Sequence, residues 1–254
     1  MFAKRGQITI FIILGILLVI IAGIVIFSFS LKMPQQKVTP LQTEAVVQMV
    51  EKCLEQTAEK AILTTGKRGG YFILPLEATT GLRDDVPYFK NGMNDFFPSS
   101  EKRAEEIGKY IDTMLDFCLD FTVFEKQGYN IIVKSPYTKV VLSDVSKPQL
   151  DIRTELPLTF KKGLQTKKLE FFRVRLPAEQ LQKDFLVAQE IVKTQEGRGI
   201  CITCFSDLAD ENSLFVEVLP YYDNVYVYEI TDEDYVLGDE KYVLRFAVKY
   251  GEQS

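Results

Sequence analysis

The four cysteines carry the most readily reactive side chains of this sequence, and two of them, Cys201 and Cys204, form a C-x-x-C pair. Three arrangements fit such a pair: a local structural disulfide, a redox-active dithiol, and two ordinary buried thiols. A dithiol at a helix N-terminus is reactive because the helix dipole lowers the pKa of the thiol. Thioredoxin-like motifs follow a buried strand, whereas a predicted helix and two glycines precede Cys201. This context weakens the redox arrangement and leaves the other two open.

The other two cysteines, Cys53 and Cys118, each lie on the apolar stripe of a predicted amphipathic helix. Packing these stripes together would bring the thiols close, and a disulfide that closes so long a loop constrains the unfolded chain by roughly 4 kcal/mol in the entropy model. Two buried free thiols are the alternative, since cysteine is small and apolar enough for a core. A structural zinc site needs four ligands and would consume every cysteine, so neither a metal nor another cofactor is predicted.

The composition narrows the range of functions. The chain has no histidine, which removes Ser-His and Cys-His catalysis and the usual general base near neutral pH. No catalytic residue is predicted, although carboxylate or lysine chemistry remains open. The formal net charge is −5, and because the four charges up to Thr43 are all positive, residues 44–254 carry −9. An acidic domain of this kind is not expected to bind nucleic acid, and it is expected to be repelled from anionic lipid.

Three further segments are considered as binding sites, and one of them remains a candidate. Tyr226 and Tyr228 share one face of a predicted strand and can present aromatic surface to a glycan or a protein, with burial in the strand core as the alternative. The glycine-rich run Gly66–Gly70 is predicted to end a helix, because it lacks the spacing of a phosphate-binding loop. The acidic run Thr231–Asp234 lacks the spacing of a calcium loop and is predicted to be a solvated turn.

The elements that must position these residues begin with an uncharged run of 26 residues from Gly6 to Leu31. About 20 helical residues cross a bilayer core of ~30 Å, and every face of this run is apolar, so we predict a transmembrane helix over residues 7–31. A cleaved secretory signal would have a shorter apolar region and a small-x-small cleavage site. The short basic stub, residues 1–6, is predicted to stay in the cytoplasm, which puts the C-terminal part outside the membrane.

The residues around the start of this run resemble a known type of signal. The stretch Lys4–Gln7 (KRGQ) directly before an apolar run is similar to the class III, type IV pilin-like, signal of archaeal surface proteins. The resemblance implies that a peptidase cuts between Gly6 and Gln7 and leaves the apolar helix on the mature chain. Leu14 also matches the family pattern, whereas Phe11 stands where the family has a glutamate used in filament assembly. A plain, uncleaved signal anchor is the alternative.

Beyond a polar linker over residues 32–41, the spacing of apolar residues predicts an α+β fold with antiparallel sheets and amphipathic helices. Helices are expected over residues 40–66, 99–121, 177–197 and 200–211. Strands are expected over residues 71–74, 129–133, 139–142, 149–160, 169–176, 214–219, 225–230 and 242–248, with a loop over 77–98 and Pro157 at an edge or bulge. A helix followed by a run of strands occurs twice, which suggests two subdomains, residues 42–162 and 163–254.

Together these patterns predict a single-pass, membrane-anchored surface protein with a structural or interaction role. The stretches Val50–Leu54, Gly69–Tyr71 and Leu244–Tyr250 are similar to uncharacterised archaeal membrane-anchored proteins, a likeness that implies no activity. The expected partners are the lipid bilayer along residues 7–31 and, outside it, further copies of the chain or other surface proteins. The alternative function is that of an envelope thiol-disulfide oxidoreductase that uses Cys201 and Cys204.

Overall fold

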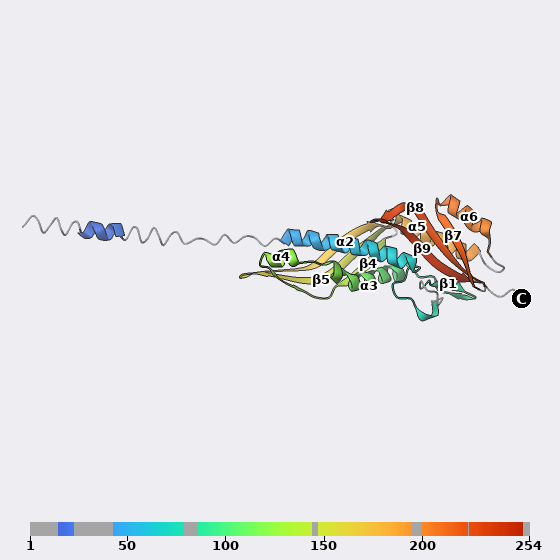
Figure 1. Ribbon diagram of the computed structural model, residues 1–254, viewed down its shortest axis with the longest axis horizontal. Coiled ribbons are helices and arrows are strands. Elements are labelled where there is room, and N and C mark those ends of the chain that lie inside the picture. Colours follow the sequence, from blue (N-terminus) through green and yellow to red (C-terminus); the bar gives the residue numbers. More distant parts are fainter. Residues whose placement is uncertain are drawn as a thin grey trace, which may run out of the picture. The chain divides into compact units, whose positions relative to one another are not determined.

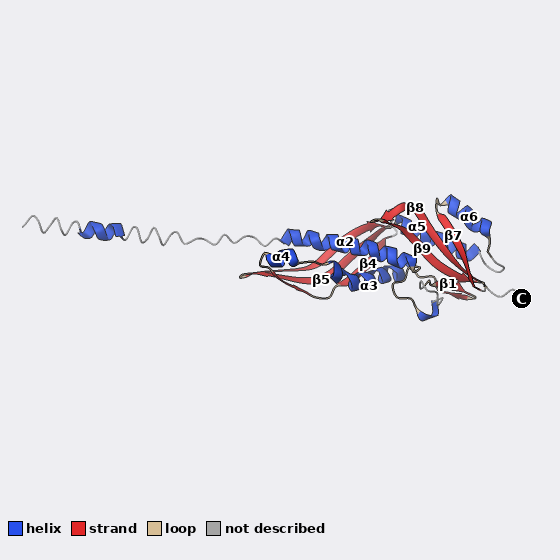
Figure 2. Cartoon of the chain, viewed as in Figure 1, coloured by secondary structure: helices blue, strands red, loops and turns tan. Residues whose placement is uncertain are grey.

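The computed structural model describes residues 15–22, 43–78, 86–143, 147–194, 200–222 and 224–250. The chain divides into two units, Met1–Pro40 and Leu41–Ser254, and in the first unit the described residues 15–22 are helical with exposed side chains. In the second unit, helices and two β-sheets form one compact α+β body with its own core (Figures 1 and 2). The predicted α+β class is confirmed for this unit.

Two long helices, α2 (Thr43–Lys67) and α3 (Ser100–Cys118), pack against each other along their apolar stripes. The start of α3 is capped by Ser99, whose hydroxyl oxygen accepts a hydrogen bond from the backbone N–H of Lys102 at 3.2 Å. The packed stripes bring Cys53 and Cys118 to disulfide-bonding distance, with their Cα atoms 5.8 Å apart. Of the two alternatives left by the sequence, the structure therefore favours the disulfide over two free thiols.

The first sheet consists of β3 (Asn130–Val133), β4 (Tyr137–Ser143), β5 (Gln149–Lys162) and β6 (Gln165–Pro177). Strand β6 pairs with one edge of β5, and β4 and β3 share the other edge, all antiparallel. Alternate residues of β5, from Leu150 to Phe160, are buried in the core with α2 and α3, while the residues between them are half-buried or exposed. One face of this sheet is therefore core and the other faces solvent.

Helix α3 lies close to β4 because one of its residues has no side chain. A Cβ atom at Gly108 would lie only 2.9 Å from the carbonyl oxygen of Thr138. Beneath this contact the buried hydroxyls of Thr138 and Thr154 form a hydrogen bond at 2.9 Å, so that two polar side chains of the inner face satisfy each other. A larger residue at position 108 would push the helix away from the sheet.

The second sheet has the strand order β2 (Asn94–Asp95), β1 (Tyr88–Asn91), β9 (Glu240–Lys249), β8 (Val225–Leu237), β7 (Phe215–Tyr222). Helices α2, α5 (Glu179–Thr194) and α6 (Ile202–Glu211) pack against it. Stacked rings of Phe89 and Phe246, with centroids 4.4 Å apart, form part of this core. Strand β1 pairs with β9 in parallel, so the sheet is mixed, which corrects the prediction of purely antiparallel sheets.

Three local predictions differ from the structure. Residues 71–74, predicted as a strand, form none. The predicted loop over residues 77–98 contains β1, β2 and the end of a single 3-10 turn, Leu76–Ala78. The subdomain division predicted between residues 162 and 163 falls in the turn of the β5–β6 hairpin, whose strands pair from Lys162 and Gln165 onward. By contrast, Pro157 lies at a register shift between β5 and β6, as predicted.

Among the described residues, no helix combines the length and the apolar character needed to cross a bilayer. The span predicted over residues 7–31 is described only at 15–22, so most of that prediction lies outside the described residues, as do the stub 1–6 and the linker 32–41. Residues Gly6 and Gln7, the predicted processing site, lie there too.

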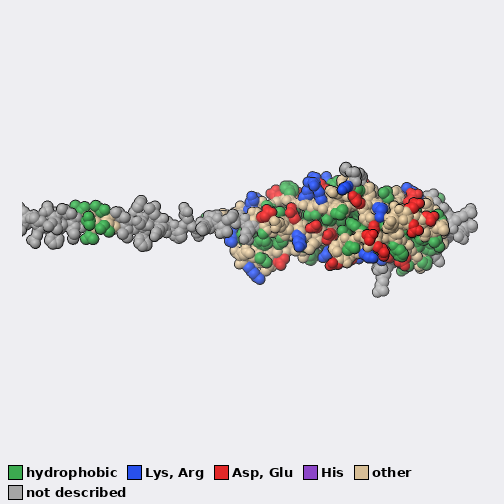
Figure 3. Space-filling model, turned by 90° about the horizontal axis from the view of Figure 1, so that it is seen from above, with side chains coloured by type: hydrophobic (Ala, Val, Ile, Leu, Met, Phe, Trp, Pro, Cys, Tyr) green, Lys and Arg blue, Asp and Glu red, His purple; other side chains and the backbone are tan. Residues whose placement is uncertain are grey.

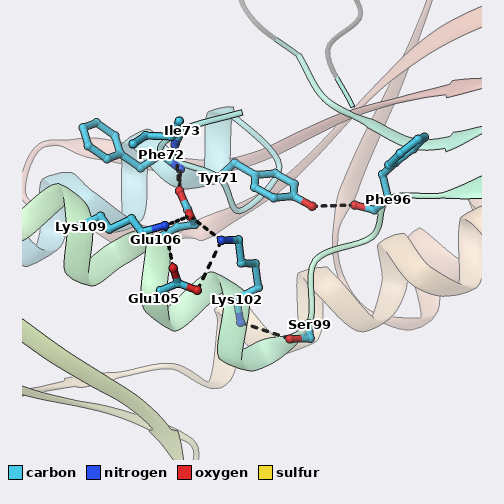
Figure 4. Close-up of polar contacts among 9 residues, drawn as sticks. All are labelled: Tyr71, Phe72, Ile73, Phe96, Ser99, Lys102, Glu105, Glu106 and Lys109. Carbon is cyan, nitrogen blue, oxygen red and sulfur yellow. Dashed lines mark hydrogen bonds and ion pairs between the residues drawn. The ribbon is translucent and has the colours of Figure 1, made fainter. Parts of the chain in front are cut away.

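The end of α2 is held by a buried glutamate of α3 (Figure 4). Gly69 and Gly70, both with positive φ, turn the chain after Lys67, which confirms the predicted helix-ending turn. One carboxylate oxygen of Glu106 then accepts hydrogen bonds from the backbone N–H groups of Phe72 and Ile73, at 3.0 and 2.9 Å. The polar anchor explains why this segment forms no strand: its N–H groups bond to a side chain instead of a neighbouring strand.

Lysines complete the environment of this carboxylate. The other oxygen of Glu106 contacts the ammonium groups of Lys109 at 2.8 Å and Lys102 at 3.0 Å (Figure 4). Burial by itself would raise the pKa of Glu106, but the N–H of Ile73 and the two lysines outweigh it and hold that pKa below its usual value. Neighbouring Glu105 contacts the same two lysines, but its side chain is 54% exposed against 1% for Glu106.

We expect Glu106→Gln to lower the free energy of unfolding by about 2 kcal/mol at pH 7, because the buried N–H groups and lysines lose their charged partner. Glu105→Gln is the matched control and should cost less than about 1 kcal/mol, because exposed ion pairs contribute little. Since the pKa of Glu106 is lowered on folding, its contribution is present at neutral pH and fades as the pH falls below about 4. Urea unfolding at pH 7 and pH 3.5 measures the free energy of unfolding of each variant and its pH dependence. If Glu106→Gln and Glu105→Gln lower the free energy of unfolding equally, Glu106 is not the stabilising anchor.

Candidate binding surface

The solvent-facing side of the first sheet carries an ordered set of charged and aromatic side chains. Strand register places them in three rows across β4, β5 and β6: Tyr137–Glu155–Phe171, Lys139–Arg153–Arg173 and Val141–Asp151–Arg175. We call these nine residues the cationic face. The two aromatic side chains of the first row are 66% and 76% exposed, which is unusual for large rings in a folded protein.

A shallow hollow of about 510 Å³ lies over the first two rows. Six residues of the cationic face line it, together with Thr154 and Phe172 of the same strands. The rings supply flat apolar surface, the cations supply donors, and the carboxylate of Glu155 supplies an acceptor. This combination suits a partner that presents negative charge next to apolar or ring-shaped groups.

The middle row is electrostatically unfavourable by itself. Lys139, Arg153 and Arg173 stand directly opposite one another on three adjacent strands, and like charges in such cross-strand positions destabilise a sheet. Among the described residues, Lys139 has no ion-pair partner. A negatively charged group over this row would relieve the repulsion, so the arrangement favours an anion at this place.

One acidic residue, Asp151, offsets part of the positive charge. It accepts a hydrogen bond from Nε of Arg173 at 2.6 Å and one from Arg153 at 2.8 Å. The Arg173 guanidinium is the main reason that the pKa of Asp151 lies far below its usual range. These contacts also fix the direction of the guanidinium groups of Arg153 and Arg173. Arg175, which lies opposite Asp151 on β6, has no ion-pair partner among the described residues.

The charge of the first sheet contrasts with that of the remaining chain. Strands β3 to β6 hold eight Lys and Arg residues and three acidic residues, a net charge of +5, although residues 44–254 carry −9. On the side seen in Figure 3, acidic side chains gather over the end of the unit opposite the β5–β6 hairpin. Summing the charge over the whole domain concealed this contrast; counting Lys and Arg strand by strand would have revealed it.

The C-x-x-C pair lies at the N-terminus of α6. Cys201 is the N-cap residue, and its sulfur accepts a hydrogen bond from the backbone N–H of Cys204 at 3.3 Å. The two residues are half-buried and at disulfide-bonding distance, with Cα atoms 5.3 Å apart. The described element before them is helix α5 and not a buried strand, so the surroundings differ from those of thioredoxin-like motifs.

The structure separates the two tyrosines proposed as a binding pair. Tyr228 is fully buried and packs edge-on against Phe205 of α6, with ring centroids 6.2 Å apart, so the core alternative holds for it. Tyr226 is half-buried and lines a hollow of about 400 Å³ between α6 and β7, together with Ile202 and Phe215. Only Tyr226 is therefore placed to meet a partner.

The acidic run Thr231–Asp234 lies within strand β8 and not in a solvated turn, which corrects the prediction. Asp232 is buried and accepts a hydrogen bond from Lys183 of α5 at 3.3 Å. Next to Lys183, burial raises the pKa of Asp184 to about 7, and the hydrogen bond from Gln180 only partly opposes this effect. These carboxyl groups belong to the packing of α5 on β8.

Over the described residues, no three His, Cys, Asp or Glu side chains lie close enough together to hold a metal ion. Comparisons of the chain with protein-family models, with curated proteins and with solved structures found no match. Function must therefore be inferred from the chemistry of the surface, and the cationic face is the feature with the clearest chemical preference.

We expect the cationic face to bind a soluble polyuronate more strongly than the rest of the surface does. In the Leu41–Ser254 unit, neutralising Lys139 and Arg175 to Gln should weaken binding about fivefold, because two exposed ion pairs contribute roughly 1 kcal/mol. The matched control, Lys193→Gln with Lys249→Gln, removes the same charge from exposed residues outside the first sheet. Calorimetric titration at low salt measures both; equal weakening by the two pairs would show that only net charge matters.

Proposed function

We propose that the protein is a single-pass, membrane-anchored surface protein that uses the cationic face to hold an anionic partner outside the cytoplasmic membrane. The observation that carries the interaction role is the row of three opposed cations with exposed rings beside it, on an otherwise acidic chain. A sheet face used only for stability would not gather like charges. Partners of this chemistry include acidic glycans and the acidic parts of other surface proteins or of further copies of this chain.

The anchoring half of the proposal rests on sequence alone. An uncharged stretch that covers residues 7–31 is stable in lipid and not in water. The resemblance of KRGQ to a class III signal supports a pilin-like precursor that is cut after Gly6. The finding that both cysteine pairs lie at disulfide distance agrees with an oxidising exterior, where such bonds persist.

We expect the full chain to stay with the membrane pellet after an alkaline carbonate wash and to be digested by protease added to intact cells. Mass spectrometry of the native protein should find a mature chain that begins at Gln7. Gly6→Leu should block that cut without releasing the protein from the membrane, because the apolar helix remains. A full chain that leaves the pellet in carbonate would rule out the anchor, whereas an intact N-terminus in the pellet would rule out only the processing.

A thiol-disulfide oxidoreductase is the second candidate, and the position of Cys201 favours it. A cysteine at the N-cap of a helix is where the dipole stabilises a thiolate, and both residues of the pair are partly accessible. The preceding helix argues against a thioredoxin-like fold, so this activity remains the weaker proposal.

The two functions differ in a turnover assay. An oxidoreductase would catalyse the reduction of insulin by dithiothreitol, and Cys201→Ser would abolish that activity, since no thiolate could attack the substrate disulfide. The matched control, Cys53→Ser with Cys118→Ser, should keep the activity and lose only thermal stability. An interaction protein should show no catalysis above the rate with dithiothreitol alone, for either form.

A further inference from the structure

We propose that the closed end of the β5–β6 hairpin, residues 161–168, docks on the anionic headgroups of the lipid bilayer. This end of the hairpin is distinct from the cationic face. Lipid binding here goes beyond the proposed function and rests on the proposed anchor only because the anchor would bring the hairpin near lipid. The proposed partner is a membrane surface, and binding to it would orient the Leu41–Ser254 unit on that surface.

The hairpin lies at the end of the unit where the chain enters it. The Cys53–Cys118 pair joins the first half of α2 to the last residue of α3. Just beyond α3, Phe121 packs against Phe160 with ring centroids 6.4 Å apart, and Phe160 is three positions before the turn residue Gly163. Figure 1 shows the start of α2 and the hairpin at the same end. The hairpin therefore lies at the end of the Leu41–Ser254 unit from which the chain would lead back to the proposed anchor (Figure 1).

The hairpin end is built to hold its shape. Cross-strand pairing continues to Lys162 and Gln165, so that only Gly163 and Leu164 form the turn. Gly163 has a φ of +59°, a conformation that glycine adopts without strain. The ammonium group of Lys162 lies 4.5 Å from the ring centre of Tyr129, which ties the turn to the neighbouring chain. A rigid tip of this kind loses little conformational freedom when it binds.

The tip combines positive charge with an exposed apolar side chain. Four lysines, Lys161, Lys162, Lys167 and Lys168, flank the turn, and no acidic residue lies between positions 156 and 169. Three of them are exposed, and none of those three has an ion-pair partner among the described residues. Leu164 at the apex is fully exposed, at 105%. A leucine surrounded by lysines matches the two components of an interfacial lipid surface, its acyl boundary and its charged headgroups.

A bilayer explains this tip better than a soluble polyanion does. A polyanion in water would use the lysines but would gain little from the fully exposed leucine at the apex. Each lysine near an anionic membrane strengthens binding by about fivefold, and the charge of the acidic remainder is screened beyond about 10 Å at 0.1 M salt. The local charge of the tip therefore outweighs the net charge of −9, which had predicted repulsion from anionic lipid.

The test uses the compact Leu41–Ser254 unit and vesicles with 30% anionic phospholipid, compared with purely zwitterionic vesicles. We expect binding to the anionic vesicles only, which weakens with salt. Neutralising Lys161, Lys167 and Lys168 to Gln should weaken it about 100-fold, and Leu164→Ser should weaken it about tenfold with no charge removed. The control variant neutralises Lys193, Lys241 and Lys249, three exposed lysines of α5 and the second sheet, and should stay within about threefold of the parent.

Three results would overturn the proposal: no binding to anionic vesicles, equal weakening by the tip and control variants, or a Leu164→Ser variant that binds vesicles like the parent. If soluble polyuronate binding falls with the tip lysines while vesicle binding does not, the tip belongs to a polyanion site instead. Thermal unfolding of each variant excludes loss of fold as the cause. Because the unit lacks residues 7–31, failure here leaves the anchor untouched, and failure of the carbonate test leaves the tip proposal standing.

Discussion

The structure depends on how the α2–α3 pair is fastened. A pair of cysteines joins the helices at one end, and the carboxylate of Glu106 holds the chain that leaves α2 at the other end. Between these points Gly108 lets α3 approach β4 closely. With both ends held, the two helices form an apolar surface on which the first sheet packs. One face of that sheet is buried there, and the other faces solvent. The second sheet packs against α2 as well, so this helix contributes to both halves of the core.

A sheet with one bare face can use that face for binding, and here the side chains on it are far from neutral. Stability alone favours mixed charges or small polar residues on such a surface, because opposed like charges repel. The middle row of the cationic face departs from this rule. Asp151 reduces the repulsion only in part, because it pairs with Arg153 and Arg173 but not with Lys139. The cost is tolerable because the residues are exposed and solvent screens them. An anion placed over this row would relieve the repulsion among its three cations.

The cationic face and the hairpin tip belong to the same sheet but differ in chemistry. The face has flat rings and guanidinium groups that are already directed by Asp151, and these suit a defined partner. The tip has lysines around one exposed leucine, and these suit a fluid surface that needs no exact fit. If the first unit holds the chain in a bilayer, the tip and the face give the external unit two different tasks, to orient itself and to bind.

The sequence by itself determined most of the elements and their class, because the apolar spacing of helices such as α3 and strands such as β9 reflects one buried side. It also made a Cys53–Cys118 disulfide one of two alternatives, since both residues lie on stripes that have to pack, and the structure places them at bonding distance. It could not supply the direction of β1 beside β9, because a strand's side-chain pattern is the same for parallel and antiparallel neighbours. Only the tertiary structure decided which residues stand side by side: register put Lys139, Arg153 and Arg173 in one row although 34 positions separate the first from the last. It also buried Tyr228 under α6 and gave Glu106 its backbone partners, contacts that depend on long-range packing and leave no local signal in the chain.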